Sequence, residues 1–463
     1  MALERQPGQA KFTFFNKVFG CQMNVSDCDD ISARLAAHGG VLVDNPFGAD
    51  LVLVNTCTVR QKAEEKAYSY FGQLKHAGAM SGRNPFIVAM GCVVPKNRQH
   101  IGEKFPHVDL LVNYSDPDVV FSELLESFPP LGDGMLADGF SPLADPARCQ
   151  QSFVTAIRGC NHRCSFCIVP WARGPQRDVP LEQIVAEAQA HERAGAPDVV
   201  VLGQSVMAYG KTSGDGSQRL SEMMEAVLES TGFKWVGFLT SLACDLNEDI
   251  CERVIAHPRV TPLLHLPLQS GSDKVLGEMR RQHDMARYKR LVAKAREVRP
   301  DLYLTTDLLV GFPTETEADF QQTLEAAQEI GFDDAFMFAY SERPGTHSAR
   351  VYHDTDLPRE VKIGRLSKLI EQQRKQSAER SQRYVGQELE VIVEQVDGEG
   401  GGVVARTAFN KPVRLNSCAT PIGGFTRVKI TGVKVSSFLG EETGFNILDA
   451  ARLAQRVPEL ATR

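Results

Sequence analysis

Apolar runs alternate with amphipathic stretches over the first quarter of the chain. Three runs have the length and composition of buried strands: residues 12–19, 51–54 and 85–90. Stretches with helical periodicity lie between them, at residues 27–37 and 61–75. This alternation is typical of a parallel sheet with crossover helices. It predicts a doubly wound α/β domain over residues 11–128.

The same alternation returns in the middle of the chain, over residues 152–383. Six apolar runs predict strands near residues 154–157, 199–202, 235–239, 263–266, 303–309 and 334–338. Helical stretches between them include residues 181–194, 220–229 and 285–298. Six β/α units predict a partial (β/α)6 barrel, open where an eight-unit barrel would close. A long basic amphipathic helix follows at residues 358–384, and it fits a solvated bridging helix as well as a nucleic-acid contact.

The pattern changes at the two ends of this central region. Residues 129–151 are rich in Pro, Gly and Asp, which predicts a linker between domains. Residues 384–450 predict a small OB-like barrel of five strands. Its β runs lie between Gly-rich turns, at residues 389–396, 402–407, 413–415 and 427–435. Residues 451–463 are expected to form a tail.

Composition narrows the function classes. The formal net charge is −7, so any nucleic-acid site must be a local patch. No apolar run reaches the roughly eighteen residues that span a bilayer. The first residues lack a secretory signal, so we expect a cytoplasmic protein that binds no membrane. In a reducing cytosol the eleven cysteines are expected to be metal ligands or packing residues rather than disulfides.

The most specific motif is a Cys-x3-Cys-x2-Cys triplet after the first strand of the central region. It consists of Cys160, Cys164 and Cys167. A 4Fe-4S cluster held by three thiolates keeps one iron open, and that iron can chelate S-adenosylmethionine (SAM). Electron transfer then splits the sulfonium and releases a 5′-deoxyadenosyl radical. The alternative is a zinc site with His162 or Cys149 as fourth ligand, but structural zinc usually uses two paired cysteine arms.

A second set of cysteines follows three apolar runs of the N-terminal region. Cys21, Cys57 and Cys92 each come directly after a predicted strand. Parallel strands place such residues at one carboxyl edge of the sheet, where open α/β sheets bind ligands. Each cysteine alone fits a packing role, but together they favour a second three-thiolate 4Fe-4S cluster. The other cysteines are predicted to pack: Cys28, Cys149, Cys244, Cys251 and Cys418.

The triplet and its position resemble the radical SAM superfamily, and the flanking segments resemble its methylthiotransferase family. The matching segments are residues 20–24 (Gly-Cys-Gln-Met-Asn), 55–60 (Asn-Thr-Cys-Thr-Val-Arg), 91–92, 202–204, 265–272, 306–313 and 340–346. The C-terminal β region resembles a TRAM domain, an RNA-binding element. The Cys-Gln-Met-Asn signature resembles the tRNA branch of the family, known as MiaB.

The resemblance implies insertion of a methylthio group at C2 of N6-isopentenyladenosine beside the anticodon, at position 37 of tRNA. It implies two 4Fe-4S clusters and two SAM molecules, with an electron donor such as flavodoxin or ferredoxin; the sequence does not identify the sulfur donor. Implied SAM contacts are Gly203, Gln204, Ser241, Gln269, Ser270, Arg281, Asp307 and Gly311. Implied tRNA contacts are Tyr340, Arg343 and Thr346. No side chain is assigned as a catalytic acid or base.

Three alternatives stay open at this point. The same clusters would serve an enzyme that modifies a ribosomal protein, or one that acts on threonylcarbamoyladenosine in tRNA. The third is an RNA-binding protein without catalysis whose cysteines hold zinc. The chain departs from the family pattern at Trp171, Ser205, Leu242, Thr314 and Gln282. These departures lie close to the predicted mouth of the active site and bear on contacts with substrate or cofactor.

Overall fold

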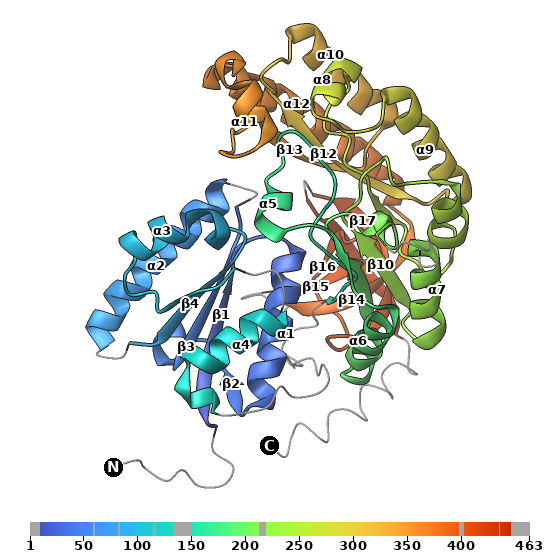
Figure 1. Cartoon of the computed structure of the whole chain (residues 1–463). Helices are drawn as coiled ribbons and strands as arrows, with labels where there is room; N and C mark the ends of the chain where they lie inside the picture. Colours follow the sequence, from blue (N-terminus) through green and yellow to red (C-terminus); the bar gives the residue numbers. More distant parts are fainter. Residues whose placement is uncertain are drawn as a thin grey trace, which may run out of the picture.

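The computed structural model describes residues 10–58, 61–81, 84–113, 117–132, 151–212, 219–397, 402–434 and 436–445. An N-terminal α/β unit, a central α/β unit and a C-terminal β barrel follow one another along the chain (Figure 1). Most of the expected linker, Cys149 and the expected tail lie outside the described residues. Among the described helices none is long and apolar enough to cross a bilayer.

The N-terminal sheet has five parallel strands in the order β2-β1-β3-β4-β5. The strands are β1 (Phe12–Val18), β2 (Gly40–Leu42), β3 (Leu51–Thr56), β4 (Phe86–Gly91) and β5 (Leu110–Leu111). This order is that of a doubly wound fold whose switch point lies between β1 and β3. All six residues of β3 are buried, as expected of a central strand covered on both faces.

Helices cover both faces of this sheet. They are α1 (Gln22–Ala37), α2 (Gln61–Ser81), α3 (Val94–Lys104) and α4 (Pro117–Ser127). Leu51 and Leu53 of β3 pack with α1 and α4, whereas Val52 and Val54 pack with α2 and α3. The predicted doubly wound unit is therefore confirmed. The first helix was expected from residue 27, but it begins at Gln22, and only three residues separate it from the end of β1.

Six parallel strands form the central unit, as predicted. They are β6 (Ser152–Thr155), β9 (Asp198–Leu202), β10 (Trp235–Leu239), β11 (Leu263–His265), β12 (Tyr303–Val310) and β13 (Asp334–Ala339). They pair as β6-β9-β10 and β11-β12-β13, and a parallel bridge between Val236 and Val260 joins the two halves. The result is the expected partial barrel.

Helices cover the outside of the partial barrel. They are α6 (Leu181–Arg193), α7 (Leu220–Ser230), the π-helix η4 (Ile250–Ile255), α9 (Met285–Val298), α10 (Glu317–Ile330) and α12 (Arg359–Ser381). Val199 and Val201 of β9 belong to the core under these helices. Val200 and Leu202 face the other way and pack against Met23 of α1. The N-terminal unit thus packs against the inner side of the open barrel.

The remaining elements are short. They are η1 (Pro46–Gly48), η2 (Pro129–Leu131), β7 (Ile157–Arg158), α5 (Val169–Arg173), β8 (Arg177–Asp178), η3 (Val206–Ala208), α8 (Asp273–Glu278), α11 (His347–Val351), η5 (His353–Thr355) and η6 (Gln382–Tyr384). Among them α5 lies between the N-terminal sheet and the central strands (Figure 1).

Several cations of α12 are used inside the protein. Arg365 is buried and pairs with Glu315 at 2.8 Å. Arg380, and Arg383 of the following η6, both bind Asp333 at 2.8 Å. These pairs fasten α12 to the central unit, which supports the bridging-helix interpretation. The cations that stay exposed on this helix include Lys368, Arg374 and Lys375.

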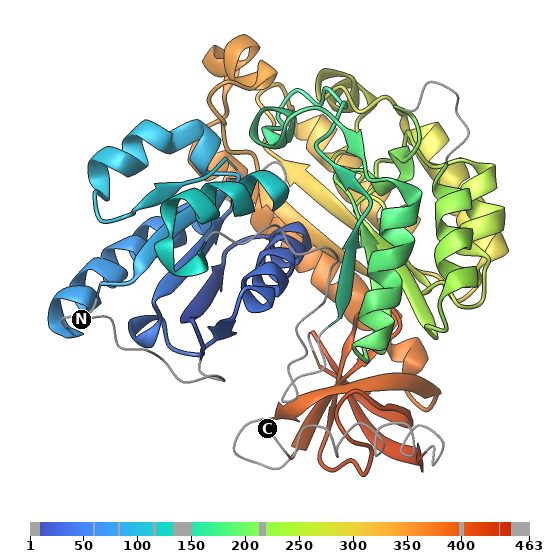
Figure 2. The same ribbon diagram turned by 60° about the horizontal axis from the view of Figure 1, so that its bottom comes forward.

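The C-terminal strands close a barrel in the order β14-β15-β16-β18-β17, so the five-stranded barrel is confirmed (Figure 2). The strands are β14 (Glu388–Asp397), β15 (Gly402–Thr407), β16 (Pro412–Leu415), β17 (Phe425–Val433) and β18 (Phe438–Phe445). The sequence pattern did not reveal β18. The barrel docks on the central unit through Phe409, whose ring stacks on Tyr303 at 4.5 Å. Leu263 belongs to the same apolar cluster.

Candidate active site

The cysteine triplet lies on the loop between β7 and α5. Gly159 precedes Cys160 with a φ of +74°, and an added Cβ there would lie 2.2 Å from the Pro175 carbonyl oxygen. Only glycine fits this position, because both the backbone conformation and the space exclude a side chain. The Gly159 N–H donates to Gln204 Oε1 at 3.2 Å. The loop that carries the triplet is thereby anchored to the end of β9.

Nitrogen donors point at two thiols of the triplet. Arg281 Nη1 lies 3.4 Å from Cys164 Sγ, and Arg281 Nη2 donates to the Pro267 carbonyl at 3.1 Å. The backbone N–H of Val169, the first residue of α5, donates to Cys167 Sγ at 3.4 Å. Positive charge and N–H groups stabilise thiolates, so the surroundings of the triplet suit sulfur ligands of a metal centre.

Burial acts on the same thiols in the opposite direction. It raises the pKa of Cys160 to about 11 and the pKa of Cys167 to about 12, with Cys164 adding to the rise in both. Without a metal these thiols are protonated at neutral pH. Metal ligation requires thiolates, so cluster binding at this loop must release protons.

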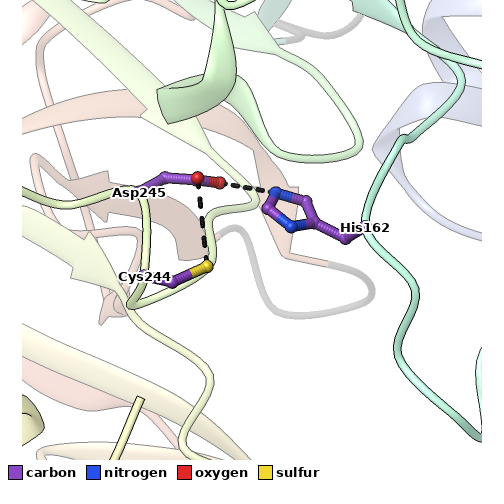
Figure 3. Close-up of side chains that lie close together, drawn as sticks. All are labelled: His162, Cys244 and Asp245. Atoms are coloured by element: carbon purple, nitrogen blue, oxygen red, sulfur yellow. Dashed lines mark hydrogen bonds and ion pairs between the residues drawn. The ribbon is translucent and has the colours of Figure 1, made fainter. Parts of the chain in front are cut away.

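A buried carboxylate ties the triplet loop to the barrel (Figure 3). Asp245 Oδ2 contacts His162 Nε2 at 2.8 Å and accepts from Ser205 Oγ at 2.7 Å. Lys211 Nζ donates to the other oxygen at 2.6 Å. Burial raises the pKa of Asp245, but hydrogen bonds from His162, Lys211 and Ser205 outweigh it and bring the pKa to about 2. The loop is held by a carboxylate that stays ionised.

The spacing of the cysteines bears on the zinc alternative. In the described part of the chain, His162, Cys244 and Asp245 are the only group that brings three ligand atoms within 4.8 Å of one another. Ligands of one zinc ion lie about 2.3 Å from it when they are thiolates, so they would be this close. Neither cysteine set is spaced for a single ion. At the group in Figure 3, the Lys211 ammonium already neutralises the carboxylate.

The second set of cysteines meets at the carboxyl edge of the N-terminal sheet. Cys21 is the N-cap of α1, and Cys57 and Cys92 follow β3 and β4. The Cys92 N–H donates to the carbonyl of Thr56, the residue before Cys57, at 3.0 Å. An added Cβ on Gly20, which precedes Cys21 with a φ of +144°, would lie 2.9 Å from Cys57 Cβ. The three loops therefore contact one another.

The thiol of Cys92 has a charged neighbour from the central unit. Arg173 Nε donates to Cys92 Sγ at 3.1 Å. Burial raises the pKa of Cys92, while Arg173 lowers it. Cys57 and Cys92 are buried and Cys21 is exposed. The arrangement resembles that of the triplet: three thiols, with an arginine beside one of them.

Two residues implied in SAM contacts have buried polar atoms without a partner. Ser241 Oγ and Arg281 Nε form no hydrogen bond, although both atoms are inaccessible to solvent. Buried polar groups in native proteins are nearly always hydrogen-bonded, so a ligand that satisfies them is the natural explanation. Arg281 lies against Cys164 of the triplet, and Ser241 follows β10, three residues before Cys244, whose ligand atom lies within 4.8 Å of His162 in the triplet loop.

Other implied SAM contacts have internal partners. Ser270 Oγ lies 3.3 Å from Thr323 Oγ1 of α10. An added Cβ on Gly311 would lie 2.6 Å from Lys362 Cγ of α12, so this glycine is required by packing. Gly203 packs on Ile157, and the backbone of Gln269 has a φ of +75°. Asp307 Oδ2 lies 3.6 Å from His265 Nε2.

The residues implied in tRNA contacts lie on the segment after β13. Tyr340 OH donates to Ser348 Oγ at 3.0 Å, and Thr346 caps α11. Both side chains are buried. Arg343 Nη1 lies 4.0 Å from Glu64 Oε2 of α2. Arg343 therefore faces the N-terminal unit, whereas Tyr340 and Thr346 also have structural roles.

Some departures from the family pattern have a structural account. Ser205 donates to Asp245, as described above, and Thr314 Oγ1 donates to Glu278. Trp171 on α5 is 55% exposed, and Gln282 has a φ of +57°. Leu242 is buried.

The packing cysteines also lie where expected. Cys28 and Cys251 are part of the N-terminal and central cores. Cys244 and Cys418 are half-buried beside Asp245 and Glu442, respectively.

Comparisons with known proteins follow the same division of the chain. Residues 154–327 match the radical SAM superfamily, residues 13–113 match the uncharacterized protein family UPF0004, and residues 382–441 match the TRAM domain. A Thermus thermophilus protein named tRNA-2-methylthio-N(6)-dimethylallyladenosine synthase is 38% identical over 442 residues, covering 92% of this chain and 90% of the relative. An Acetivibrio thermocellus protein of the same name is 35% identical, covering 94% and 92%.

The chain belongs to the tRNA-2-methylthio-N(6)-dimethylallyladenosine synthase family. Because the members of this family are enzymes, the alternative of an RNA-binding protein without catalysis whose cysteines hold zinc is excluded. Its radical SAM part implies SAM and one 4Fe-4S cluster. A solved structure supports the fold: the radical SAM methyltransferase TsrM from Kitasatospora setae has a TM-score of 0.53 at 13% identity, covering 73% of this synthase-family chain and 77% of TsrM.

Sequence reasoning did not single out Asn24, Arg173 or Asp245. Asn24 and Arg173 meet at the second cysteine set, and Asp245 holds the triplet loop. Asn24 is the last residue of the Cys-Gln-Met-Asn signature, so the sequence did contain a signal for this residue. No local signal marks Arg173 or Asp245, because their partners are far away along the chain.

Proposed function

We propose that this chain inserts a methylthio group at C2 of N6-isopentenyladenosine at position 37 of cytoplasmic tRNA. Full-length relatives with more than a third of residues identical carry the corresponding name. The Cys-Gln-Met-Asn signature of residues 21–24 supports the tRNA branch. The further assignments of two clusters and two SAM molecules to this chain are part of the same proposal.

The observation that carries the proposal is the position of α5 between the two cysteine sets. The first residue of this helix donates to Cys167 Sγ, and its last residue, Arg173, donates to Cys92 Sγ. Five helical residues rise by about 6 Å, so the two sets lie close to each other. Chemistry that passes a group from one centre to a substrate bound at the other requires such proximity.

The donor sets fit two iron-sulfur clusters. The triplet has three thiols on one loop, the second set has three thiols on neighbouring loops, and each set has an arginine that donates to sulfur. When bound, one such cluster supplies the electron that cleaves SAM to a carbon radical, and the other supplies the site for the sulfur that is transferred. A radical is required because the C2–H bond of adenine is neither acidic nor electrophilic.

The chain's own side chains bind and orient SAM. Ser241 Oγ and Arg281 Nε offer unused hydrogen-bonding atoms beside the triplet. The guanidinium of Arg281 suits a carboxylate, and the Ser241 hydroxyl suits an amine or a ribose. Gln204 keeps the triplet loop in place through the N–H of Gly159. The remaining implied SAM residues are assigned by family resemblance.

The partners follow from the same assignment. The TRAM barrel and the exposed cations of α12, Lys368, Arg374 and Lys375, are the proposed contacts for the tRNA backbone. Arg343, which faces the N-terminal unit, is the proposed contact near the modified base. A flavodoxin or ferredoxin is the proposed electron donor.

Nucleoside mass spectrometry tests the proposed function. Transfer RNA from cells that lack the protein should lose 2-methylthio-N6-isopentenyladenosine and accumulate N6-isopentenyladenosine. A gene copy for the chain should restore the methylthio nucleoside, and a copy that carries C164A should not. Loss of a methylthio group from a ribosomal protein, or from threonylcarbamoyladenosine, would instead support the corresponding alternative.

A further inference from the structure

A buried arginine crosses the boundary between the N-terminal and central units. Arg173 is 6% exposed, and its guanidinium contacts three groups of the N-terminal unit. Its Nη2 donates to Asp27 Oδ2 at 2.9 Å and to Asn24 Oδ1 at 3.1 Å, and its Nε donates to Cys92 Sγ at 3.1 Å. The central unit thus supplies a charged donor to a cysteine of the other unit.

The charge balance around this guanidinium is tight. Asp27 is fully buried and is bound by two arginines, Arg173 and Arg158, the latter at 3.1 Å. Arg158 also lies 3.8 Å from a second carboxylate, Asp30, whereas Arg173 shares Asp27 with Arg158. Buried charges are stable only when they are compensated. A thiolate at Cys92 would place a further negative charge directly beside the Arg173 guanidinium, which shares Asp27 with Arg158.

The helix that carries Arg173 also contacts the other cysteine set. The Val169 N–H, at the start of α5, donates to Cys167 Sγ at 3.4 Å. Arg173 is therefore held at a fixed place relative to the triplet, as well as to Cys92. One rigid turn of helix connects the surroundings of both sets.

We propose that Arg173 is a positioning residue for the cluster of the second set, supplied across the boundary by the unit that binds SAM. This inference rests on the proposed function, because it assumes that Cys21, Cys57 and Cys92 hold a 4Fe-4S cluster. Hydrogen bonds and charges at the sulfur ligands set the reduction potential of such clusters. A cation beside Cys92 stabilises the reduced, more negative state, so Arg173 raises the potential of this cluster.

A purely structural role makes a different prediction, and Arg158 provides the matched control. Both arginines bind Asp27 across the same boundary. Arg158 binds the carboxylates of Asp27 and Asp30, whereas Arg173 also donates to the Cys92 sulfur. Substitution of either arginine would weaken the contact between the N-terminal and central units. An effect on the cluster's electronic properties follows only from the loss of Arg173.

The experiment uses the full chain with C160A, C164A and C167A, which leaves only the second set of cysteines. This protein is reconstituted anaerobically with iron and sulfide, and its cluster is titrated with a reductant and followed by electron paramagnetic resonance. R173M should make reduction about ten-fold less favourable, a shift of about 59 mV to more negative potential for one electron. R158M should leave the potential and the spectrum unchanged. The reduction potential of R173K should also lie below that of the wild type. The lysine ammonium lacks the planar set of N–H donors with which the guanidinium contacts both Asp27 and the Cys92 sulfur.

The outcomes separate this inference from the proposed function. An unchanged potential in R173M, or an equal shift in R158M, would overturn the role of Arg173 while leaving the cluster in place. A reconstituted protein without iron would overturn the second cluster and this inference together. If R173M fails to fold, the reduction potentials of R173K and R158M are compared instead. A potential of R173K equal to that of the wild type would overturn the proposal.

Discussion

Asn24 of α1 and Asn55 of β3 exchange hydrogen bonds next to Cys21 and Cys57. Asn24 Nδ2 donates to Asn55 Oδ1 at 2.7 Å, and Asn55 Nδ2 donates to the Asn24 carbonyl at 2.9 Å. Asn24 Nδ2 also reaches the Thr56 carbonyl at 2.9 Å. Both asparagines are fully buried. The pair fixes the separation of the two cysteine loops before any cluster binds.

Replacement of Asn24 by Ala should therefore reduce the iron content of the second site. The substitution leaves the buried Asn55 Oδ1 without its Asn24 donor and removes an acceptor from Arg173, and each unsatisfied group costs about 1–3 kcal/mol. Iron and acid-labile sulfide after anaerobic reconstitution measure the loss, which should approach half of the wild-type amount. Gln22→Ala is the control, because Gln22 belongs to the same signature but is exposed. A full iron content in Asn24→Ala would show that the loops keep their separation without this pair.

The two cysteine sets should have separable functions. Cys164→Ala removes a thiol beside Arg281 and should abolish the reductive cleavage of SAM to 5′-deoxyadenosine. Cys57→Ala removes a thiol of the second set and should leave this cleavage active while stopping methylthio transfer. Chromatography of 5′-deoxyadenosine and mass spectrometry of the tRNA nucleosides measure the two steps. Methylthio transfer by Cys57→Ala at the wild-type rate would disprove the second cluster.

Much of the fold could be predicted because buried strands leave a clear pattern. β3 begins with four consecutive apolar residues, and four of the five residues of β9 are apolar, since both faces of each strand are covered. The strand β18 was missed because its residues include two glutamates and two glycines and pair in a closed barrel that supplies their partners. The start of α1 was missed because the polar residues at its first turn, Gln22 and Asn24, are typical of a loop.

The candidate site was predictable only as far as local motifs reach. Cysteines with a fixed spacing, or at the ends of apolar runs, stand out in a sequence. Arg173 and Asp245 do not, because they act on residues 81 and 83 positions away, respectively. Ser270 and Gly311 also have packing roles, which a motif cannot distinguish from a role in SAM binding.

Removal of the C-terminal barrel should weaken tRNA binding by at least about ten-fold. A chain that ends at Gly386 loses all five barrel strands, and with them the proposed contacts to phosphates. The truncation also uncovers Leu263 and Tyr303, so its fold needs a control. Cleavage of SAM in the absence of tRNA provides one, and it should persist. An unchanged affinity in a truncated chain that still cleaves SAM would remove the RNA role from the barrel.

His191 makes the stability of the central unit depend on pH. The side chain is buried in α6. Burial lowers the pKa of His191 to about 4, and a hydrogen bond with the Phe153 backbone opposes this shift only in part. The unfolded chain has a pKa near 6.5 for this group. The folded form therefore prefers the neutral ring, and its stability is complete above pH 6.5 and falls as the pH drops towards 4.

Substitution of His191 by Gln should flatten this part of the pH profile. For a pKa that is about 6.5 in the unfolded and about 4 in the folded chain, the wild type loses about 2 kcal/mol between pH 7.5 and pH 5 through this residue. Thermal unfolding followed by circular dichroism at the two pH values measures the loss. His283, with its pKa lowered to about 4 by burial and Arg281, titrates in the same window but is present in both proteins. The difference between wild type and His191→Gln therefore isolates His191, and parallel profiles for the two proteins would contradict a neutral buried ring.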